Sequence, residues 1–180
     1  MKKINLIVAM LSIGLLVSGC TSKNGVSFDS ESTGINVKSS TKSVSSEVSD
    51  KLSYINVVES EIDGESVSLK SVHFQFDKFN ITDNMGVIVK ENYKVVSDIT
   101  NKNTNVKIKL EGNCDEWGTD EYNYALGLKR AKTIKDSLVE DGISADKIVL
   151  VSFGESNPVC SDKSDKCWKK NRRVDYRLLP

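Results

Sequence analysis

The chain has 180 residues, of which 38% are hydrophobic, and this length allows one ordinary domain with some additional tail. Lys and Arg together number 25, as do Asp and Glu, so the formal net charge is zero. A nucleic-acid-binding protein normally carries a clear basic excess, and the composition argues against that class. The one histidine and four cysteines show no zinc-like spacing, so we expect no metal and no other cofactor.

Residues 1–19 have the pattern of an export signal. Two lysines precede an apolar run, 4–17, that is too short for a membrane-spanning helix, which needs about 20 residues. The run ends in Leu16-Val17-Ser18-Gly19-Cys20, which resembles the bacterial lipobox. That resemblance implies cleavage before Cys20 and acylation (palmitate) of Cys20, and several acyl chains make a lasting anchor. The alternative is an ordinary signal peptide with a chance cysteine. By the same resemblance, Thr21 in place of aspartate favours the outer over the inner membrane.

Residues 20–53 differ sharply in composition from the rest of the chain. Such a polar segment buries too little apolar surface to offset its ordering entropy, so we expect a flexible tether after the lipidated cysteine. About 30 such residues have a root-mean-square span of roughly 30 Å. Serine dominates the segment, at Ser39, Ser40, Ser43, Ser45, Ser46 and Ser49.

From residue 54 to residue 180 the pattern becomes that of a folded domain. Short strands are predicted at 54–58 and 66–70, on either side of an Asp63-Gly64 turn. Val72, Phe74 and Phe76 then alternate with polar residues, which predicts a half-buried strand over 72–77. Apolar positions at helical spacing predict a helix over 82–100, capped by Thr82.

The second half of the domain continues this alternation of element types. A strand is expected at 106–110, a helix at 119–140 that stops at Gly142, a strand at 148–153 and, after a loop, a last strand at 174–178. Strands separated by helices indicate an α/β class domain, with helices packed on a sheet in the order β-α-β-α-β-β.

The densest polar cluster lies between the strand at 106–110 and the helix at 119–140. Alternation along the strand places Cys114 on the core face, as a buried thiol, and brings Asp115 out at the strand end. In the following helix, Asn123 and Arg130 are seven residues apart and share a face, with Leu126 and Gly127 between them. A helical glycine costs about 1 kcal/mol against alanine, so Gly127 suggests the close approach of a ligand or another chain.

A carboxylate, an amide and a guanidinium in one groove suit a zwitterionic ligand. Asp115 would bind an ammonium group and Arg130 a carboxylate. The alternative is that these two residues form a structural ion pair or merely solvated caps. Catalysis fits less well: Asp115 and Glu116 are adjacent, whereas glycosidase carboxylates lie about 5–9.5 Å apart across a bond. His73 has no nucleophile beside it and is expected on the strand surface or groove edge, so we predict that the chain is not an enzyme.

The segment from Phe74 to Leu178 resembles the OmpA-like peptidoglycan-binding domain family, and the lipobox and tether extend the likeness to its lipoprotein members. The resemblance rests on Phe74-Gln75-Phe76-Asp77, on the run from Glu111 to Thr119, on Glu121-Tyr122-Asn123, on Leu126-Gly127-Leu128-Lys129-Arg130-Ala131, on Val151-Ser152-Phe153-Gly154-Glu155 and on Asn171-Arg172-Arg173-Val174. It implies a mixed sheet and non-covalent binding to the cell wall.

The resemblance also implies which residues bind the ligand. Asp115 would hold the ammonium and Arg130 the carboxylate of diaminopimelate in the stem peptide, in a groove lined by Phe76, Asp77, Leu126, Asn123, Asn171 and Arg172. It implies a Tol-Pal partnership with a TolB-like periplasmic protein. Two positions depart from the family: Asn113 stands where histidine is usual, and Trp117 where arginine is frequent.

With Cys20 lipidated, three cysteines remain. Cys160 and Cys167 lie seven residues apart in one loop, and we expect a disulfide between them in the oxidising periplasm, with Cys114 reduced. Pairing of Cys114 with either of the others stays open. Two other functions also remain open, an envelope scaffold or adhesin whose wall contact is incidental and a wall hydrolase, although no residue pair supports the latter.

Overall fold

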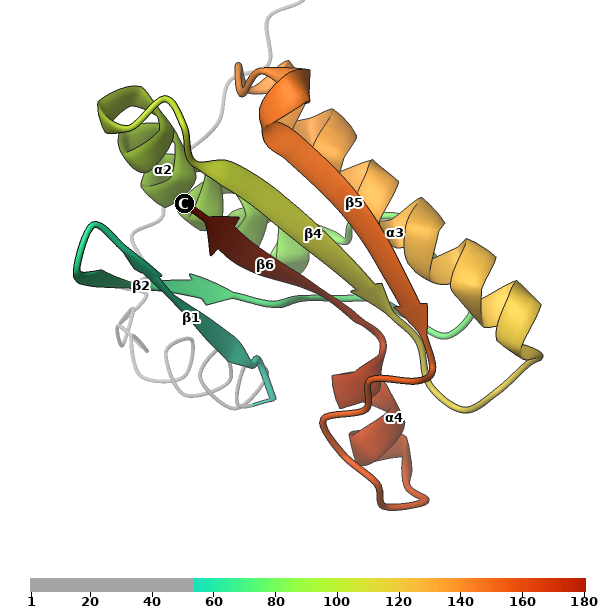
Figure 1. The fold of residues 1–180 in the computed structure, drawn as a ribbon. Helices are drawn as coiled ribbons and strands as arrows, with labels where there is room; N and C mark the ends of the chain where they lie inside the picture. Colours follow the sequence, from blue (N-terminus) through green and yellow to red (C-terminus); the bar gives the residue numbers. More distant parts are fainter. Residues whose placement is uncertain (1–53) are drawn as a thin grey trace, which may run out of the picture. The chain divides into compact units, whose positions relative to one another are not determined.

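The computed structural model describes residues 54–180, so the predicted signal peptide, the lipidation at Cys20 and the tether at 20–53 lie outside the described residues. The elements in chain order are β1 (Val57–Ile62), β2 (Glu65–Lys70), β3 (Val72–His73), α2 (Asp83–Lys102), β4 (Lys107–Asn113), α3 (Asp120–Glu140), a 3-10 turn (Ala145–Lys147), β5 (Ile148–Gly154), α4 (Asp165–Asn171) and β6 (Arg173–Leu179) (Figure 1). Among these residues, no helix combines the length and apolar character needed to cross a membrane.

The central sheet is mixed and has the strand order β3-β6-β4-β5 (Figure 1). Strands β4 and β5 are parallel and are joined through α3, whereas β6 runs antiparallel to both β3 and β4. A parallel pair needs such a crossover connection, which explains why α3 lies between the two strands in sequence. The mixed sheet with packed helices confirms the expected fold class.

The β1–β2 hairpin forms a separate two-stranded sheet. Its turn has positive φ at both Asp63 (54°) and Gly64 (82°), the geometry of the tight turns that match the twist of paired strands. The hairpin is attached to β6, where the Leu178 amide donates to the Ser60 hydroxyl over 3.0 Å. The turn and the second strand are confirmed, whereas the first strand lies at Val57–Ile62 and overlaps the predicted range 54–58 only at its start.

The hydrophobic core lies between the sheet and helices α2 and α3. The helical spacing that predicted these helices marks their buried faces: Met85, Ile88, Val89 and Val96 from α2 meet Ala131, Ile134 and Leu138 from α3. Each of these residues has 3% or less of its surface exposed, so both amphipathic patterns were interpreted correctly. From the sheet the core receives Val72, Val106, Ile108, Leu110, Val174 and Tyr176.

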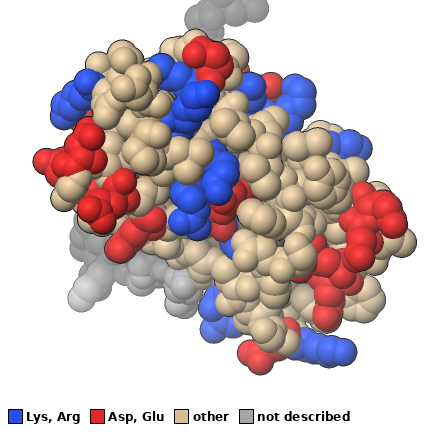
Figure 2. Space-filling view, in the orientation of Figure 1, with Lys and Arg blue, Asp and Glu red and all other residues tan. Residues whose placement is uncertain are grey.

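The opposite sheet face carries charge. Figure 2 shows Lys and Arg side chains in a band across the middle of the molecule, with Asp and Glu on both sides. Lys109 and Arg177 are register partners on β4 and β6, and both pair with Glu111, at 2.7 and 3.4 Å. Glu111 is buried by these neighbours.

The strand predicted at 72–77 is wrong beyond His73. The chain leaves the sheet there, and the Lys78 amide closes a turn on the Gln75 carbonyl with Asp77 in the left-handed region (φ 55°). Because the alternation stops, Phe76 is 59% exposed instead of buried. Of the two placements expected for His73, the strand surface is wrong, since Tyr54 and the main chain of α4 cover its ring, whereas the groove edge agrees with its place in the lining of a cleft.

A short helix, α4, replaces part of the loop expected before the last strand. The Ser164 hydroxyl caps it by accepting from the Cys167 amide at 3.3 Å. A disulfide joins Cys160 and Cys167, the pair that the sequence favoured, and Cys114 is a free, buried thiol. The Asn171 side chain also braces this segment, because its carbonyl oxygen accepts from the Val159 and Cys160 amides.

Helix α3 packs unusually close to the sheet at two glycines. A Cβ atom added to Gly112 of β4 would lie 1.9 Å from the Gly127 carbonyl oxygen, and one added to Gly127 would lie 2.4 Å from Ser152 Oγ. The close approach that Gly127 suggested is therefore made by β4 and β5 of the same domain, not by a ligand or another chain.

Candidate functional site

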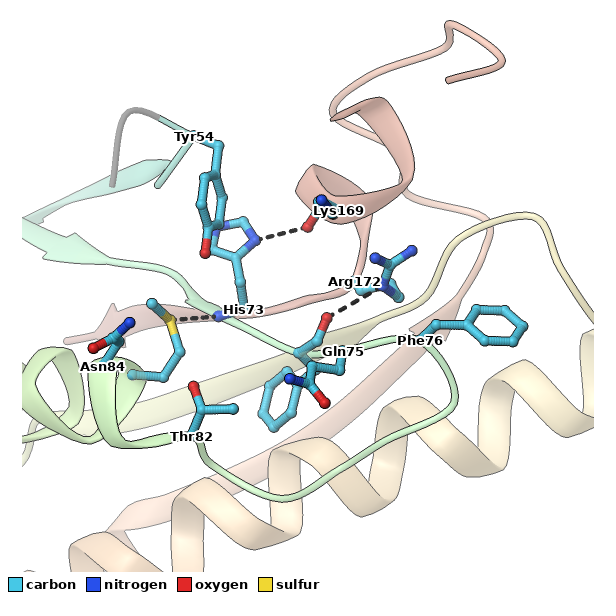
Figure 3. Close-up of a pocket in the computed structure, with 10 residues that line it drawn as sticks. Tyr54, His73, Gln75, Phe76, Thr82, Asn84, Lys169 and Arg172 are labelled. Carbon is cyan, nitrogen blue, oxygen red and sulfur yellow. Dashed lines mark hydrogen bonds between the residues drawn. The ribbon is translucent and has the colours of Figure 1, made fainter. Parts of the chain in front are cut away.

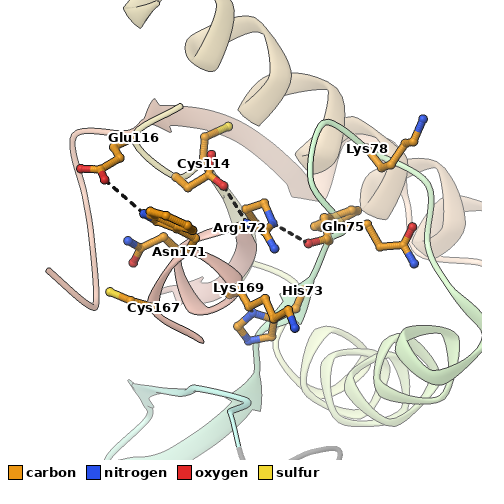
Figure 4. A network of polar contacts seen from close by, with 12 residues as sticks. His73, Gln75, Lys78, Cys114, Glu116, Cys167, Lys169, Asn171 and Arg172 are labelled. Atoms are coloured by element: carbon orange, nitrogen blue, oxygen red, sulfur yellow. Dashed lines mark hydrogen bonds and ion pairs between the residues drawn. The ribbon is translucent and has the colours of Figure 1, made fainter. Parts of the chain in front are cut away.

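The candidate site lies at the end of the sheet where β4 ends and β6 begins. Because these strands are antiparallel neighbours, Asp115 after β4 meets Arg172 before β6, although the two are 57 residues apart. Arg172 Nη1 donates to Asp115 Oδ2 over 2.7 Å, and Arg172 Nε donates to the Phe74 carbonyl oxygen over 3.2 Å (Figure 4). The side chains of Arg172 and Asp115 are only 9% and 5% exposed. The carboxylate's partner is therefore Arg172, and the alternative of an Asp115–Arg130 ion pair is wrong.

Arg130 is completely buried beside this pair. Its guanidinium lies 5.3 Å from the centre of the Phe74 ring, and burial lowers its pKa. Within residues 54–180 the Arg130 guanidinium forms no ion pair with a carboxylate. Its positive charge is therefore stabilised by the dipoles of the groups to which it donates hydrogen bonds and by charged groups nearby that it does not contact. Its hydrogen bonds go to the carbonyl oxygens of Lys78 (2.8 Å), Asn113 (2.9 Å) and Gln75 (3.2 Å) and to Cys114 Sγ (3.3 Å).

The buried face of α3 brings two further predicted residues to the site. The Thr119 hydroxyl caps this helix by accepting from the Tyr122 amide, which places Asn123 and Leu126 one and two turns inside it. Asn123 Nδ2 donates to the Asp115 carbonyl oxygen at 3.2 Å and to the Glu155 carboxylate. Its Oδ1 is buried without a hydrogen-bond partner in the described part of the chain, which leaves an acceptor available.

A cleft of about 460 Å³ opens beside Arg172 (Figure 3). Of the predicted lining residues, Phe76 and Arg172 border it. Sequence reasoning did not assign the others to the site, because most of them come from distant segments of the chain. The full lining is Tyr54, His73, Phe74, Gln75, Phe76, Thr82, Asn84, Met85, Lys169 and Arg172.

His73 forms the inner wall of this cleft. Its Nδ1 lies 3.0 Å from the Lys169 carbonyl oxygen, and its buried Nε2 has no hydrogen-bond partner in the described residues. Burial, joined by the positive charges of Arg173 and Arg172, lowers the pKa of His73 to about 4. The imidazole is therefore neutral at neutral pH and adds no charge to the cleft.

Two predicted lining residues lie elsewhere in the site. Asp77 is exposed, and its carboxylate accepts from the Tyr122 hydroxyl, which ties the loop after β3 to α3. Asn171 faces the disulfide segment and lines a smaller cavity of about 220 Å³ next to Cys114. Burial raises the pKa of the Cys114 thiol to about 11, so it is protonated and unreactive.

The polar groups of the site suit binding. In the range 54–180, no three His, Cys, Asp or Glu side chains gather in a group that could hold a metal ion. The main feature is a pair of buried arginines with one buried aspartate, next to a cleft with an aromatic edge. Such a site is typical of a ligand-binding domain that recognises charged groups.

Residues 73–172 match the model of the OmpA family, and the chain belongs to this family. Over 71 residues the chain is 48% identical to the peptidoglycan-associated lipoprotein of Pseudomonas putida. This aligned segment covers 39% of this chain and 43% of that protein. Over 104 residues the chain is 37% identical to the peptidoglycan-associated lipoprotein of Pasteurella multocida. This aligned segment covers 58% of this chain and 67% of that protein. The chain thus spans less than half the length of the first of these curated relatives.

Solved structures agree with this assignment. The crystal structure of the peptidoglycan-associated lipoprotein from Burkholderia pseudomallei superposes with a TM-score of 0.55 at 31% identity, covering 61% of this chain and 89% of that one. The C-terminal domain of Helicobacter pylori MotB, at 21% identity and a TM-score of 0.55, shares the fold. These relatives are named as lipoproteins, which supports the prediction that the chain is not an enzyme.

Proposed function

We propose that this protein is an outer-membrane lipoprotein whose domain binds peptidoglycan non-covalently and does not cleave it. Membership of the OmpA family and likeness to proteins named peptidoglycan-associated lipoprotein support the proposal. The lipobox-like sequence before Cys20 supports a lipid anchor, and the serine-rich segment after it supports a tether that lets the domain reach the wall from the membrane.

The ligand we propose is the diaminopimelate-containing stem peptide. The observation that carries the proposal is the charge of the buried group: Arg130 and Arg172 outnumber Asp115, so the group has a net positive charge that a ligand carboxylate would neutralise. Arg172 borders the cleft, and the carboxylate would bind there, whereas Arg130 does not line the cleft and adds positive charge from the interior. Asp115 Oδ1 accepts no hydrogen bond from residues 54–180, which leaves it for the ligand's ammonium group.

The other predicted residues have supporting roles in this proposal. Phe76 provides an exposed aromatic edge to the cleft, and Asn123 positions Asp115 by donating from its Nδ2 to the Asp115 carbonyl oxygen. Leu126 adds apolar surface from the same buried face of α3. Asp77 and Asn171 hold the two loops that frame the site, through their hydrogen bonds to α3 and to the disulfide segment.

The cellular setting follows from the same family likeness. The domain would lie in the periplasm and take part in a Tol-Pal system with a TolB-like protein, contributing to envelope integrity and cell division. A single charge-assisted hydrogen bond contributes about 1.5–3 kcal/mol, so individual sites bind weakly. Many anchored copies on one polymeric wall then hold through avidity.

Co-sedimentation with purified peptidoglycan sacculi tests the proposal. The full chain in detergent is compared with Asp115→Ala, Arg130→Ala and Arg172→Ala, and far-UV circular dichroism verifies that each variant is folded. Loss of one charge-assisted contact should weaken binding roughly 10- to 150-fold. Arg177→Ala is the matched control, because Arg177 is a half-exposed arginine on the sheet, paired with Glu111 outside the site.

Free diaminopimelate should displace the chain from sacculi better than lysine, which lacks the second amino-acid centre. If the site variants and Arg177→Ala pellet as the wild type does, the wall contact lies elsewhere. If the wild type stays in solution, wall binding is refuted, and labelling on intact cells would then examine the envelope scaffold or adhesin alternative.

A further inference from the structure

The chain contains two tryptophans, and the fold brings them together. Trp117 follows Asp115 by two residues, whereas Trp168 belongs to α4, one turn before Arg172. Their ring centres are 5.4 Å apart and their planes cross at 75°, an edge-to-face contact. The pair therefore borders the proposed stem-peptide site, through the same two segments that supply the Asp115–Arg172 ion pair.

The tryptophan pair is held in place but remains accessible. Trp168 Nε1 donates to the Glu116 carboxylate over 3.1 Å, and the Cys160–Cys167 disulfide fixes the helix that carries Trp168. Trp117 is 52% exposed. In an edge-to-face pair, one ring makes contact only through its edge, so this contact leaves both of its faces free. Tryptophan is enriched at interfaces, so exposed indole surface beside the proposed site favours contact with a ligand.

The cavity beside the pair indicates the chemistry of its ligand. This cavity, of about 220 Å³, is lined by Trp168 and by three carboxylates, and no lysine or arginine lines it. The carboxylates of Glu116, Glu155 and Asp162 accept hydrogen bonds and repel anions. A neutral ligand with hydroxyl groups around an apolar ring face fits both the aromatic surface and the acceptors. Pyranose sugars have this combination.

We propose that Trp117 and Trp168 form a platform on which pyranose rings of the peptidoglycan glycan strand stack. The inference rests on the proposed function, because the wall polymer carries its stem peptides on this strand. Once a stem peptide is bound at Asp115 and Arg172, the sugar chain to which it is attached lies within a few residues' reach of the platform. The amide link to the peptide leaves the strand without the anionic charge that the carboxylates would repel.

Tryptophan fluorescence of the full chain in detergent provides a direct test. Because Trp117 and Trp168 are the only tryptophans, emission excited at 295 nm reports on this platform alone. One probe is the glycan strands freed from stem peptides by an amidase, with the lactyl carboxylates then converted to amides so that the strands stay uncharged, and the other is the free stem peptide. Glycan strands should shift the emission saturably. Trp117→Ala should weaken glycan binding roughly five- to tenfold and leave the affinity for stem peptide unchanged.

Two further variants make the result specific. Trp168→Phe keeps an aromatic ring but loses the bond to Glu116, and it should weaken glycan binding less than Trp117→Ala. Tyr124→Ala removes another aromatic ring, 56% exposed and outside the pair, and should change neither affinity.

The outcomes separate this inference from the function on which it rests. If glycan strands leave the emission unchanged while stem peptide still binds, the platform is refuted and the proposed function stands. If Trp117→Ala weakens binding of both probes equally, the pair only positions Asp115 and Arg172, and the inference is again refuted. If neither probe binds and sacculi do not pellet the chain, both proposals fail together.

Discussion

Replacing a helical glycine by alanine at two positions, one in open space and one in close contact with the sheet, tests how closely α3 packs on the sheet. Gly86 in the first turn of α2 has open space around it, since a Cβ atom added there would meet no other atom within 4 Å, so Gly86→Ala gains helix propensity at no steric cost. We expect a stabilisation of about 0.5–1 kcal/mol. Gly127→Ala gains the same propensity, but its Cβ would lie 2.4 Å from Ser152 Oγ and 2.9 Å from the Gly112 carbonyl oxygen.

The steric cost at Gly127 should exceed that gain. Ser152 Oγ donates to the Tyr124 carbonyl oxygen over 2.7 Å, so moving it away sacrifices a hydrogen bond worth about 1 kcal/mol, and the Gly112 oxygen belongs to the main chain. Overpacking typically costs about 1–3 kcal/mol. The net effect is a destabilisation of about 1–3 kcal/mol, measured by urea unfolding followed by far-UV circular dichroism. Equal stabilisation by both substitutions would refute the close contact between α3 and β4.

The remaining predictions concern the charged and titrating groups of the site. Asp115→Ala leaves Arg172 buried without its carboxylate and should lower the free energy of unfolding by about 3 kcal/mol. Arg177→Ala should change the free energy of unfolding by no more than about 0.5 kcal/mol. Equal losses for the two variants in urea unfolding would contradict the buried pair. The pKa of His73 is lowered from 6.5 to about 4 in the folded chain. As the pH falls, the unfolded chain therefore binds a proton at His73 before the folded chain does. About 3 kcal/mol of stability should be lost between pH 6.5 and about pH 4. His73→Asn should remove this loss, and an unchanged pH dependence of unfolding would refute it. The pKa of the Cys114 thiol is raised to about 11, so this thiol should resist alkylation at pH 8 in the native chain and react in urea. The intact mass of the protein would show the modification. Alkylation of the native chain at the rate seen in urea would contradict the burial of Cys114.

Most of the fold was predictable because its helices and strands have strong periodic patterns. The apolar spacing indicated the buried faces of α2 and α3, and Val96 and Leu138 on these faces are fully buried. Helix α4 escaped prediction because Ser161–Lys166 are polar and charged, a composition typical of a loop. What holds α4 is not an apolar face but its Ser164 cap and the disulfide at Cys167.

The site was predictable in its residue types but not in its pairing. Helical spacing placed Asn123 and Arg130 on one buried face of α3, as observed. The partner of Asp115 depended on the strand order, because β6 lies between β3 and β4 and carries Arg172 to the strand end. A local pattern contains no information on such a long-range neighbour. His73 lies in the cleft wall because of another long-range contact, between its ring and the main chain of α4.

An irregularity in the β4–β5 register lies next to the segment that carries Asp115. Gly112 pairs with Ser152, but Asn113 pairs with Gly154, so β5 has one extra residue at this point. Gly154 has a φ of 55°, and its carbonyl oxygen accepts from the Cys114 amide over 2.7 Å, which extends the β4 contact beyond the last strand residue. Bulges of this kind redirect side chains at the ends of strands. Alternation alone would send Cys114 and Asp115 to opposite faces, one in the core and one in solvent. Both are nevertheless buried, because the Asp115 carboxylate meets Arg172 beyond the strand end instead of reaching solvent.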